Sequence, residues 1–335
     1  WDLELLEEWK VDLEDWGVEI EDFKIEDIGS REIHKKLSDV FIVPPFSILD
    51  TRKGYWQDRK RYWLSLGIKS DLGRDPDGFI KSFKEFEKKI GNNWGRENST
   101  FDAVLCELVY RWFCIPDGKI LDPFAGGSVR GIVAVKLGYD YFGNDLSSRQ
   151  IEANINNANE VLEKESKQPR WTVGDSRNID VIAKDYQADL VFSCPPYADL
   201  EVYSDLDNDL SNMEYDEFLE AYNEIVYKTC NLLKEDRFAV FVVSDIRDKR
   251  GFYRNFVSDT IAAFKKSNLL LYNEMILVNS ITTKRLTAKR AMKNRKVSKI
   301  HQNVLVFYKG NPKNIQKIYP ELDFSYMDEQ ITSTE

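Results

Sequence analysis

The feature that most constrains the fold is a regular alternation of strand-like and helical segments between Phe101 and Gly310. Short apolar runs such as KILD and ADLVFS alternate with segments whose apolar residues repeat at helical spacing, such as VRGIVAVKLG. This alternation predicts an α/β fold in which helices cover both faces of a doubly wound, mostly parallel sheet of seven strands. The last two strand-like segments, residues 269–278 and 303–310, have no helical pattern between them, so we expect the last strand to be antiparallel.

The regions outside this alternation differ in composition, and they indicate a division into domains. Residues 1–40 are strongly acidic and are expected to be helical. Because the chain begins at Trp1, we expect this segment to be the tail of an upstream domain that is missing. Residues 41–100 combine an extended stretch with loops and are interpreted as an accessory region. Residues 101–310 are expected to form the catalytic domain, and residues 311–335 a tail.

The composition argues against several classes of protein. The four cysteines are scattered without a C-x-x-C pair and there are only two histidines, so neither a disulfide framework nor a metal site is expected. No apolar run approaches the roughly 18 residues that a membrane span requires. We therefore expect a protein of the reducing cytoplasm, without a metal and without contact with a membrane.

Charge is unevenly distributed along the chain. The net charge is −10, yet Thr282–Lys299 contains eight basic residues and no acidic one, and Thr51–Trp63 combines five basic with four aromatic residues. Such runs are often only a solvated surface, and the aromatic residues could belong to the core. The alternative is that both segments bind the phosphates of a nucleic acid. The candidate DNA-binding residues are Arg52, Lys53, Arg59, Arg61, Lys289, Arg290, Arg295 and Lys296.

Three successive strand-like segments end on an aspartate, at Asp122, Asp145 and Asp175. Parallel strands end at one edge of the sheet, so the three carboxylates should gather where such folds bind ligands. Asp122 leads into a glycine turn that lets the backbone approach a ligand, and Asp145 lies where a carboxylate can accept hydrogen bonds from ribose hydroxyls. Simpler interpretations stay open, because any such fold needs a tight turn and an aspartate before two serines is a good helix cap. No phosphate-binding G-x-x-x-x-G-K-[ST] motif is present.

The strand-like run ADLVFS ends abruptly on Cys194-Pro195-Pro196-Tyr197. Proline cannot donate a hydrogen bond to a sheet, and the residue before it is held extended, so the strand must stop in a stiff corner. We expect this corner to lie at the same edge as the three aspartates and to direct Tyr197 outward.

In this order, the motifs LDPFAGGS, GNDLS, VGDS and SCPPY resemble those of S-adenosylmethionine-dependent methyltransferases. The similarity is closest to the amino-group class that makes N6-methyladenine or N4-methylcytosine in DNA, and it extends over roughly residues 101–310. It implies a Rossmann-like domain with S-adenosylmethionine as cofactor and double-stranded DNA as partner. The implied cofactor site is Asp122, Pro123, Phe124, Ala125, Gly126, Gly127, Asp145, Leu146, Asp175 and Ser176.

The resemblance also implies that Cys194, Pro195, Pro196 and Tyr197 form a pocket for a base that has been flipped out of the duplex. In that family the aromatic ring stacks on the base, and the carbonyl of the first proline accepts a hydrogen bond from its amine. Two residues depart from the family pattern, Cys194 in place of Asp, Asn or Ser, and Ser128 in place of a further glycine. Three interpretations of Cys194 are open. It could be a tolerated small residue, with the Pro195 carbonyl as the sufficient acceptor, or a nucleophile for carbon-5 methylation of cytosine. Alternatively, Asp199 could supply the acceptor in its place.

Other interpretations remain open at this stage. RNA or a protein amide could be the methyl acceptor, or the domain could bind the cofactor without catalysis. Asp245 could line the base pocket or cap the next helix, and the acidic segment 198–218 could be a lid. More loosely, the N-terminal segments resemble methylases of phages and mobile elements that follow a ParB-like domain. This suggests restriction-modification and either an upstream ParB-like domain or a dimer partner.

Overall fold

The computed structural model describes residues 38, 41–69, 101–197, 208–279 and 284–322. The chain divides into two compact units, one of Trp1–Pro45 with Leu322–Glu335 and one of Phe46–Glu321. The second unit contains all the elements considered below. Nearly all of segment 1–40, the stretch 70–100 and the end of the expected tail lie outside the described residues.

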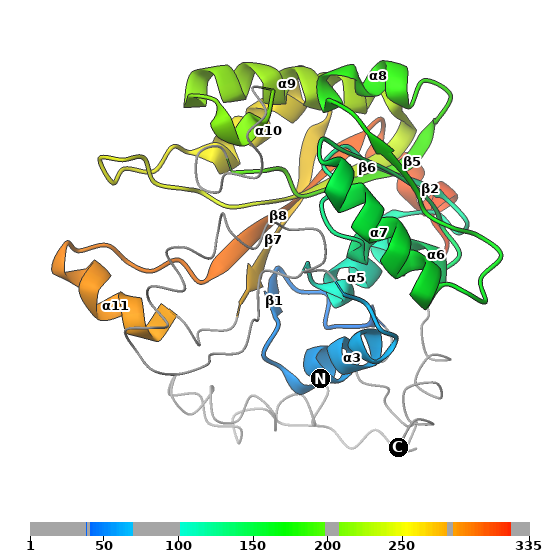
Figure 1. Ribbon diagram of the computed structural model, residues 1–335, viewed down its shortest axis with the longest axis horizontal. Coiled ribbons are helices and arrows are strands. Elements are labelled where there is room, and N and C mark those ends of the chain that lie inside the picture. The colour runs from blue at the N-terminus through cyan, green and yellow to red at the C-terminus, as the bar shows by residue number, and fades with distance from the viewer. Residues whose placement is uncertain (1–37, 39–40, 70–100, 198–207, 280–283, 323–335) are drawn as a thin grey trace, which may run out of the picture. The chain divides into compact units, whose positions relative to one another are not determined.

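Within the described residues, eight strands form one mixed sheet in the order β1-β7-β8-β6-β5-β2-β3-β4 (Figure 1). The strands are β1 (Ile48–Asp50), β2 (Lys119–Asp122), β3 (Asp140–Asp145), β4 (Arg170–Val173), β5 (Ala188–Ser193), β6 (Leu233–Val243), β7 (Leu270–Val278) and β8 (His301–Lys309). Strands β2 to β6 pair in parallel, as do β1 and β7, whereas β8 is antiparallel to both β6 and β7. The mostly parallel sheet with an antiparallel last strand is therefore confirmed.

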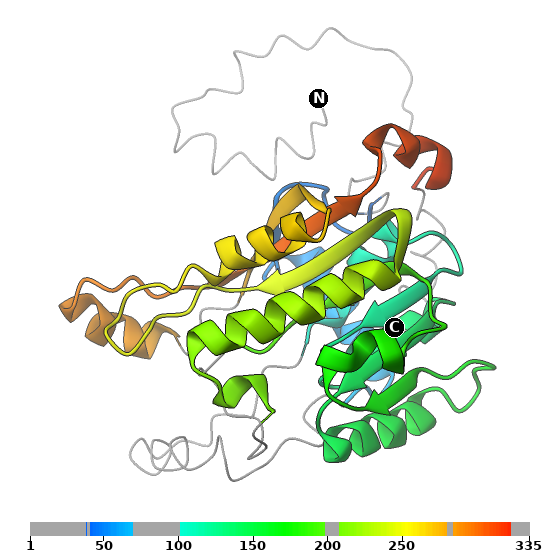
Figure 2. The ribbon, with the colours of Figure 1, turned by 90° about the horizontal axis from the view of Figure 1, so that it is seen from above.

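Helices cover both faces of this sheet, as Figures 1 and 2 show. One face carries α5 (Ala103–Phe113), α6 (Val129–Lys136) and α7 (Ser148–Val161), and the other carries α8 (Ile179–Ile182), α9 (Tyr215–Leu232) and α10 (Phe256–Lys266). The remaining elements are α3 (Gly54–Ser65), α11 (Lys284–Lys293), α12 (Ile315–Ile318) and the 3-10 turns η2 (Ser176–Asn178), η4 (Leu210–Asn212) and η5 (Pro312–Asn314). The arrangement is the doubly wound, Rossmann-like fold that the sequence predicts.

Local sequence signals explain where these elements begin and end. The central strand β5 is buried along its whole length, as an apolar run between parallel neighbours should be. The carboxylate of Asp102 accepts a hydrogen bond from the backbone N–H of Val104 at the start of α5, and the hydroxyl of Ser147 caps α7 through Gln150. Helix α6 ends before Gly138, whose φ of +89° favours glycine. Gly138 and the Ser147 cap lie directly before and after β3, the strand that ends on Asp145.

Two elements differ from the sequence prediction. Strand β1 adds an eighth strand to the seven expected, and α3 packs on α5, so residues 46–69 belong to the same compact unit as the sheet. A strand of three residues is too short to show an apolar alternation, which is why the sequence did not reveal it. In addition, the connection between β7 and β8 contains the helix α11, where no helix was expected. In the described part of the chain, no helix is long and apolar enough to cross a membrane.

Candidate active site

The residues singled out by the sequence motifs gather at one edge of the sheet. Asp122 ends β2, Asp145 ends β3, and Asp175 follows β4. The Cys-Pro-Pro-Tyr corner follows β5, which pairs in parallel with β2. Parallel pairing therefore brings motifs from four separate parts of the chain to the carboxyl ends of neighbouring strands, where open α/β sheets bind their ligands.

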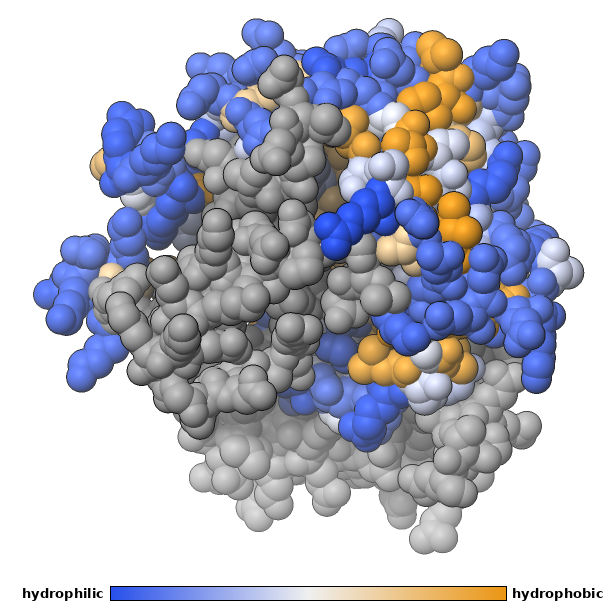
Figure 3. Space-filling view, in the orientation of Figure 1, coloured by the Kyte–Doolittle hydropathy of each residue, from blue (hydrophilic) through white to orange (hydrophobic). Residues whose placement is uncertain are grey.

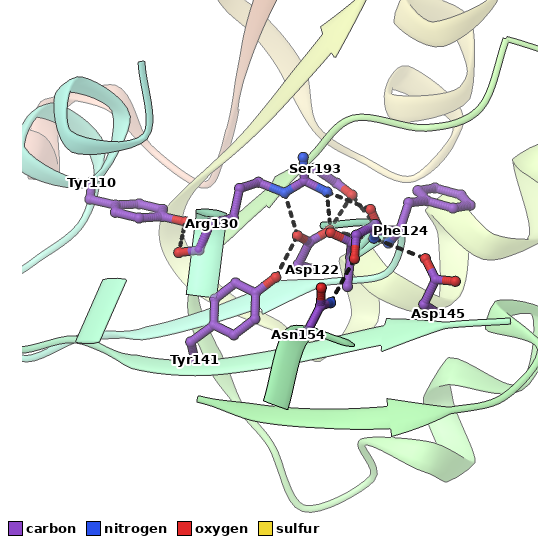
Figure 4. Close-up of polar contacts among 10 residues, drawn as sticks. Tyr110, Asp122, Phe124, Arg130, Tyr141, Asp145, Asn154 and Ser193 are labelled. Carbon is purple, nitrogen blue, oxygen red and sulfur yellow. Dashed lines mark hydrogen bonds and ion pairs between the residues drawn. The ribbon is translucent and has the colours of Figure 1, made fainter. Parts of the chain in front are cut away.

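Asp122 is the centre of a buried hydrogen-bond network (Figure 4). One carboxylate oxygen accepts hydrogen bonds from the Ser193 hydroxyl at 2.5 Å and the Phe124 N–H at 3.1 Å. The other accepts from the Arg130 Nε at 2.6 Å and the Tyr141 hydroxyl at 2.7 Å. Both oxygens are thus engaged by the protein itself. Asp122 therefore supports the turn that follows it, and its contact with the cofactor stays a prediction.

Arg130, on α6, binds the backbone of the glycine turn. Its guanidinium pairs with Asp122 and also donates to the carbonyl oxygens of Phe124 at 2.6 Å and Ala125 at 2.8 Å. Burial acts to lower the pKa of Arg130, but the Asp122 carboxylate prevails and raises it, so the guanidinium stays charged. Arg130 was not among the predicted site residues. The available signal was a cation in the first turn of the largely apolar helix VRGIVAVK, whose other cation, Lys136, ends the helix.

The turn itself depends on Gly126 and Asp145. Gly126 has a φ of +51°, and its N–H donates to the Asp145 carboxylate at 2.9 Å. The other Asp145 oxygen accepts from the Ser147 N–H at 2.9 Å, so each oxygen keeps a lone pair for a further donor. Burial raises the pKa of Asp145, and the two N–H groups partly oppose this. Because Ser147 supplies the side-chain cap of α7, the interpretation of Asp145 as a mere helix cap is not supported.

The other residues of the predicted cofactor site have different surroundings. Ser176 is buried, donates to the Pro123 carbonyl at 2.5 Å and accepts from Asn144, so it ties two loops together. Asp175 caps η2 and pairs with Arg177 at 2.6 Å; partial burial acts to raise the pKa of Asp175, but the Arg177 hydrogen bonds lower it. In the turn, Pro123 and Ala125 are buried, whereas Phe124, Gly127 and Leu146 are half-buried.

Ser128, which departs from the family pattern, has a structural role. Its hydroxyl lies 2.8 Å from the side-chain oxygen of Asn157 and 3.4 Å from the carbonyl oxygen of Lys69. Asn157 in turn accepts from the backbone N–H of Lys69 and donates to the Gly67 carbonyl. The serine therefore links the glycine turn to the end of the segment that carries α3, a contact that a glycine could not make.

The corner after β5 is connected to the glycine turn through Ser193, whose hydroxyl binds Asp122. Cys194 points elsewhere, with its Sγ 3.7 Å from the Tyr197 hydroxyl. The Tyr197 hydroxyl also accepts from Gln302 on β8 at 2.9 Å, and its ring meets the Phe256 ring edge to face at 6.2 Å. Tyr197 is half-buried rather than fully exposed, so one part of the ring packs on the core and another remains accessible.

Two further expectations concern the neighbourhood of this corner. Asp245 accepts a hydrogen bond from the backbone N–H of Val257, so it caps the start of α10 as the simpler interpretation held. Asp199 and residues 198–207 of the expected lid lie outside the described residues. An ionised Cys194 would raise the pKa of Arg130, so Arg130 is a cation within electrostatic range of this thiol that the sequence did not reveal.

The predicted DNA-binding residues divide into two groups. A DNA contact by Arg59 does not fit the structure. Its side chain is 8% exposed and pairs with Glu107 at 2.7 Å, because it lies on the buried face of α3 with Trp56 and Trp63. Arg52 and Lys53 are exposed, and Arg52 pairs with Asp50. Arg61 is also exposed and pairs with Asp58.

The second group lies on and after α11, and most of it faces solvent. Lys289 and Arg295 are exposed and Lys296 is half-buried, while Arg290 lies in α11. Figure 3 shows a mainly hydrophilic surface over this helix. Among the described residues, no three His, Cys, Asp or Glu side chains come together so that they could hold a metal ion.

Comparisons with known proteins identify a DNA methylase family for the C-terminal part of the chain. Residues 188–334 match the family model N6_N4_Mtase, which describes a DNA methylase; the match begins at β5 and includes the corner but not the glycine turn. The match confirms the resemblance to amino-group DNA methyltransferases. No curated protein matches the chain.

Several solved structures are similar to the chain at low identity. TrmN from Thermus thermophilus is 14% identical with a TM-score of 0.42. The similarity covers 64% of this chain and 50% of TrmN. Magnesium protoporphyrin IX methyltransferase from Synechocystis PCC 6803 is 12% identical with a TM-score of 0.41, covering 70% and 94%. Another Thermus thermophilus protein, described as a DNA modification methylase, is 17% identical with a TM-score of 0.31, covering 43% and 56%. At these values the similarities indicate no substrate.

Proposed function

We propose that this chain, whose residues 188–334 match the N6/N4 family of DNA methylases, methylates the exocyclic amine of adenine or cytosine in DNA. The cofactor is S-adenosylmethionine, which when bound supplies a methyl group on a positively charged sulfur. The observation that carries the proposal is the 2.5 Å hydrogen bond between Ser193 and Asp122, which are 71 residues apart in sequence. This bond fixes the base-pocket corner directly against the turn that would hold the cofactor.

The residues at the glycine turn fit the chemistry of this cofactor. Gly126 is held at a positive φ, which lets the backbone approach a ligand closely, and each Asp145 oxygen keeps an acceptor position for a ribose hydroxyl. The nearby Arg130 guanidinium is engaged by Asp122 and by two carbonyl oxygens, so it is not offered to a phosphate. A nucleoside without phosphate, rich in hydroxyl donors, therefore matches the site better than a dinucleotide.

The corner would orient the amine of the flipped base. Its carbonyl at Pro195 accepts one amine hydrogen, which directs the nitrogen lone pair toward the methyl donor, and the Tyr197 ring stacks on the base. Transfer would then be an in-line displacement: the amine nitrogen would bond to the methyl carbon as its bond to sulfur breaks, leaving a neutral thioether, and the amine would release one proton. Correct positioning would supply most of the rate. The stiffness of two successive prolines and the Ser193–Asp122 bond both serve this positioning. No covalent intermediate is required, so the departure at Cys194 does not prevent the reaction.

The test is mass spectrometry of nucleosides from the DNA of cells that express the chain, with the Tyr197→Ala variant as control. We expect N6-methyladenine or N4-methylcytosine with the wild-type chain and a strong decrease with the variant. The appearance of 5-methylcytosine would instead support the covalent route through Cys194. Radiolabelled methyl transfer to RNA or protein, with none to DNA, would overturn the choice of substrate.

We further propose that the compact unit Phe46–Glu321 is the catalytic domain and that double-stranded DNA is its partner. The resemblance of the N-terminal segments supports a source in phages or mobile elements, cytoplasmic action and an upstream ParB-like domain or dimer partner. A role in restriction-modification belongs to the same proposal. Protection of methylated DNA from a cognate nuclease would test that role, and gel filtration of the full-length protein would test the dimer.

A further inference from the structure

The loop between β6 and α10 forms a tight hairpin. Arg247 and Tyr253 pair as an antiparallel bridge, and the Asp248 backbone N–H donates to the Phe252 carbonyl at 2.8 Å. The Asp248 carboxylate accepts from the Phe252 N–H at 2.9 Å, and Gly251 turns the chain with a φ of +98°. The Arg247 guanidinium donates to the Gly251 carbonyl at 2.8 Å. The hairpin, residues 247–253, is therefore a fixed structure rather than a loose loop.

This hairpin is joined at both ends to the walls of the base pocket. It follows β6, which pairs with β5 through Ser193 and Phe241 just before the corner. It leads into α10, whose first residue, Phe256, contacts the Tyr197 ring at 6.2 Å. A hydrogen bond of 3.0 Å from the Arg254 N–H to the Ile246 carbonyl closes its base. The hairpin is thus placed next to the point where the flipped base would enter.

The tip of the hairpin presents an aromatic ring to solvent. Phe252 is 68% exposed, whereas the Tyr253 ring is covered on one side by the Arg247 guanidinium at 3.9 Å. Isolated exposed apolar residues are common on proteins, so exposure alone assigns no role. The informative point is that Phe252, the most exposed aromatic ring among the described residues, stands on a rigid support beside the candidate site.

Three cations lie on or against this hairpin, and one of them, Arg250, also pairs with Asp248 at 2.9 Å. Lys249 and Arg250 are exposed within the hairpin, and the Arg250 guanidinium lies 5.9 Å from the centre of the Phe252 ring. Lys296, which follows α11, reaches the hairpin so closely that a Cβ on Gly251 would lie 2.5 Å from its Nζ. Figures 1 and 2 both show the hairpin and α11 projecting from the same side of the sheet. An exposed aromatic side chain on a hairpin that also carries cations suits a duplex, whose phosphates flank a stack of bases.

We propose that Phe252 inserts between base pairs beside the target and occupies the space that the extruded base leaves. The proposal rests on the proposed function, since it requires a DNA duplex as substrate. Apolar side chains that enter the base stack offset part of the stacking lost when a base is flipped. Lys249, Arg250 and Lys296 would bind the phosphates on either side of the opened step. The role is confined to the duplex, because single-stranded DNA has no stack to open.

The test compares methyl transfer to one circular DNA supplied in double-stranded and in single-stranded form, using the full chain and tritiated S-adenosylmethionine. We expect Phe252→Ala to lower kcat/KM on the duplex on the order of tenfold and to leave the rate on the single strand unchanged. Phe252→Trp should restore the duplex rate, because it again offers a ring. Where the single strand is not methylated, the dissociation constants for the two forms give the same comparison.

Tyr227→Ala is the matched control, because Tyr227 is an aromatic residue on α9 that is 54% exposed. It should change neither rate, and thermal unfolding of all the variants should match the wild type. Equal losses on both DNA forms, or no loss on the duplex, would overturn the role of Phe252 while leaving the proposed function intact. If the wild-type chain methylates neither DNA form, or methylates only RNA, the proposed function is wrong. The role of Phe252, which depends on that function, is then wrong as well.

Discussion

The two halves of the sheet edge that form the candidate site are built in opposite ways. In the cofactor half, at the ends of β2, β3 and β4, the polar side chains are largely buried and bonded to one another, with Asp122 at the centre. In the substrate half, at the ends of β5 and β6, half-buried Tyr197 and exposed Phe252 and Arg250 face outward. The first half is organised before any ligand arrives. The second presents exposed ring surface, and its exposed cation Arg250 pairs with Asp248 at 2.9 Å.

This contrast has an energetic meaning. A buried ion pair loses much of its value when only one partner is removed, because the other charge is left without compensation. An exposed aromatic or cationic side chain contributes little to folding, and its removal should affect only what it binds. Substitutions in the cofactor half should therefore reduce both stability and cofactor binding. Substitutions in the substrate half should reduce turnover or DNA binding at unchanged stability.

The largest expected effect is that of Arg130→Met. It leaves Asp122 charged, buried and without its cation, and we expect the free energy of unfolding to fall by about 3–5 kcal/mol. Urea denaturation measures this loss. Arg59→Met is the matched control, since the Arg59–Glu107 pair is equally buried but does not touch the glycine turn. Both variants should lose stability. After correction for the unfolded fraction, only Arg130→Met should also bind the cofactor more weakly. Equal cofactor affinity in the two folded variants would contradict the assigned role of Arg130.

Next in size is Tyr197→Ala in the substrate half. Loss of a stacking ring should cost about 1–3 kcal/mol of transition-state stabilisation, or roughly a 5- to 150-fold decrease in kcat/KM on DNA. Tyr197→Phe keeps the ring and removes only the hydroxyl that binds Gln302, so it should retain most of the activity. Steady-state kinetics of the two variants distinguish stacking from hydrogen bonding. A Tyr197→Phe variant as defective as Tyr197→Ala would show that the hydroxyl, not the ring, matters.

A smaller effect is expected from the basic residues of α11 and its C-terminal extension. Neutralising Lys289, Arg290, Arg295 and Lys296 should weaken DNA binding by about tenfold. The logarithm of the binding constant should also fall less steeply with the logarithm of the salt concentration. The slope should decrease by up to about 0.9 for each phosphate that is no longer neutralised. Fluorescence anisotropy across a salt series measures the slope. The matched control is Arg52 with Arg61, two exposed arginines that already pair with acidic neighbours. A slope that stays the same in the quadruple variant would exclude this surface from the interface.

The same contrast explains how far the sequence could be interpreted alone. Strand ends and tight turns are encoded locally, by a glycine that must adopt positive φ or by two prolines that end a strand, so Gly126 and the corner at Pro195 were recognised. Arg130 and Ser193 were not, because their importance lies in partners that are distant in sequence and meet only in the folded sheet. Arg59 was misjudged for the related reason that a cation in a basic run shows its helix face only when the packing is known.

A modest effect is expected from pH, through Asp145. Burial raises the pKa of Asp145 above its ordinary value of 3.8. Keeping this carboxylate ionised therefore destabilises the fold at pH values above the raised pKa. This cost decreases as the pH falls from the raised pKa towards 3.8 and is absent below that value. Cofactor hydroxyls prefer the ionised form, so cofactor affinity should fall on acidification while this contribution to stability improves. Calorimetric titration of the cofactor from neutral to mildly acidic pH measures the change, which should be several-fold. The Asp145→Asn variant should bind more weakly and without this dependence, and a dependence that persists in it would assign the titration elsewhere.

The smallest effect is expected from Cys194→Ser, at the boundary between the two halves. Cys194 contacts the Tyr197 hydroxyl at 3.7 Å and lies near Arg130, whose charge Asp122 already balances. If the Pro195 carbonyl is the acceptor for the amine, a serine should serve equally well, and its better acceptor oxygen could raise the rate slightly. We expect kcat to stay within about twofold of the wild type, because one neutral hydrogen bond has a small net value. Complete loss of transfer, together with a trapped covalent adduct on a fluorinated cytosine in the wild type, would instead make the thiol a nucleophile. The corner would then position the carbon of the ring rather than its amine.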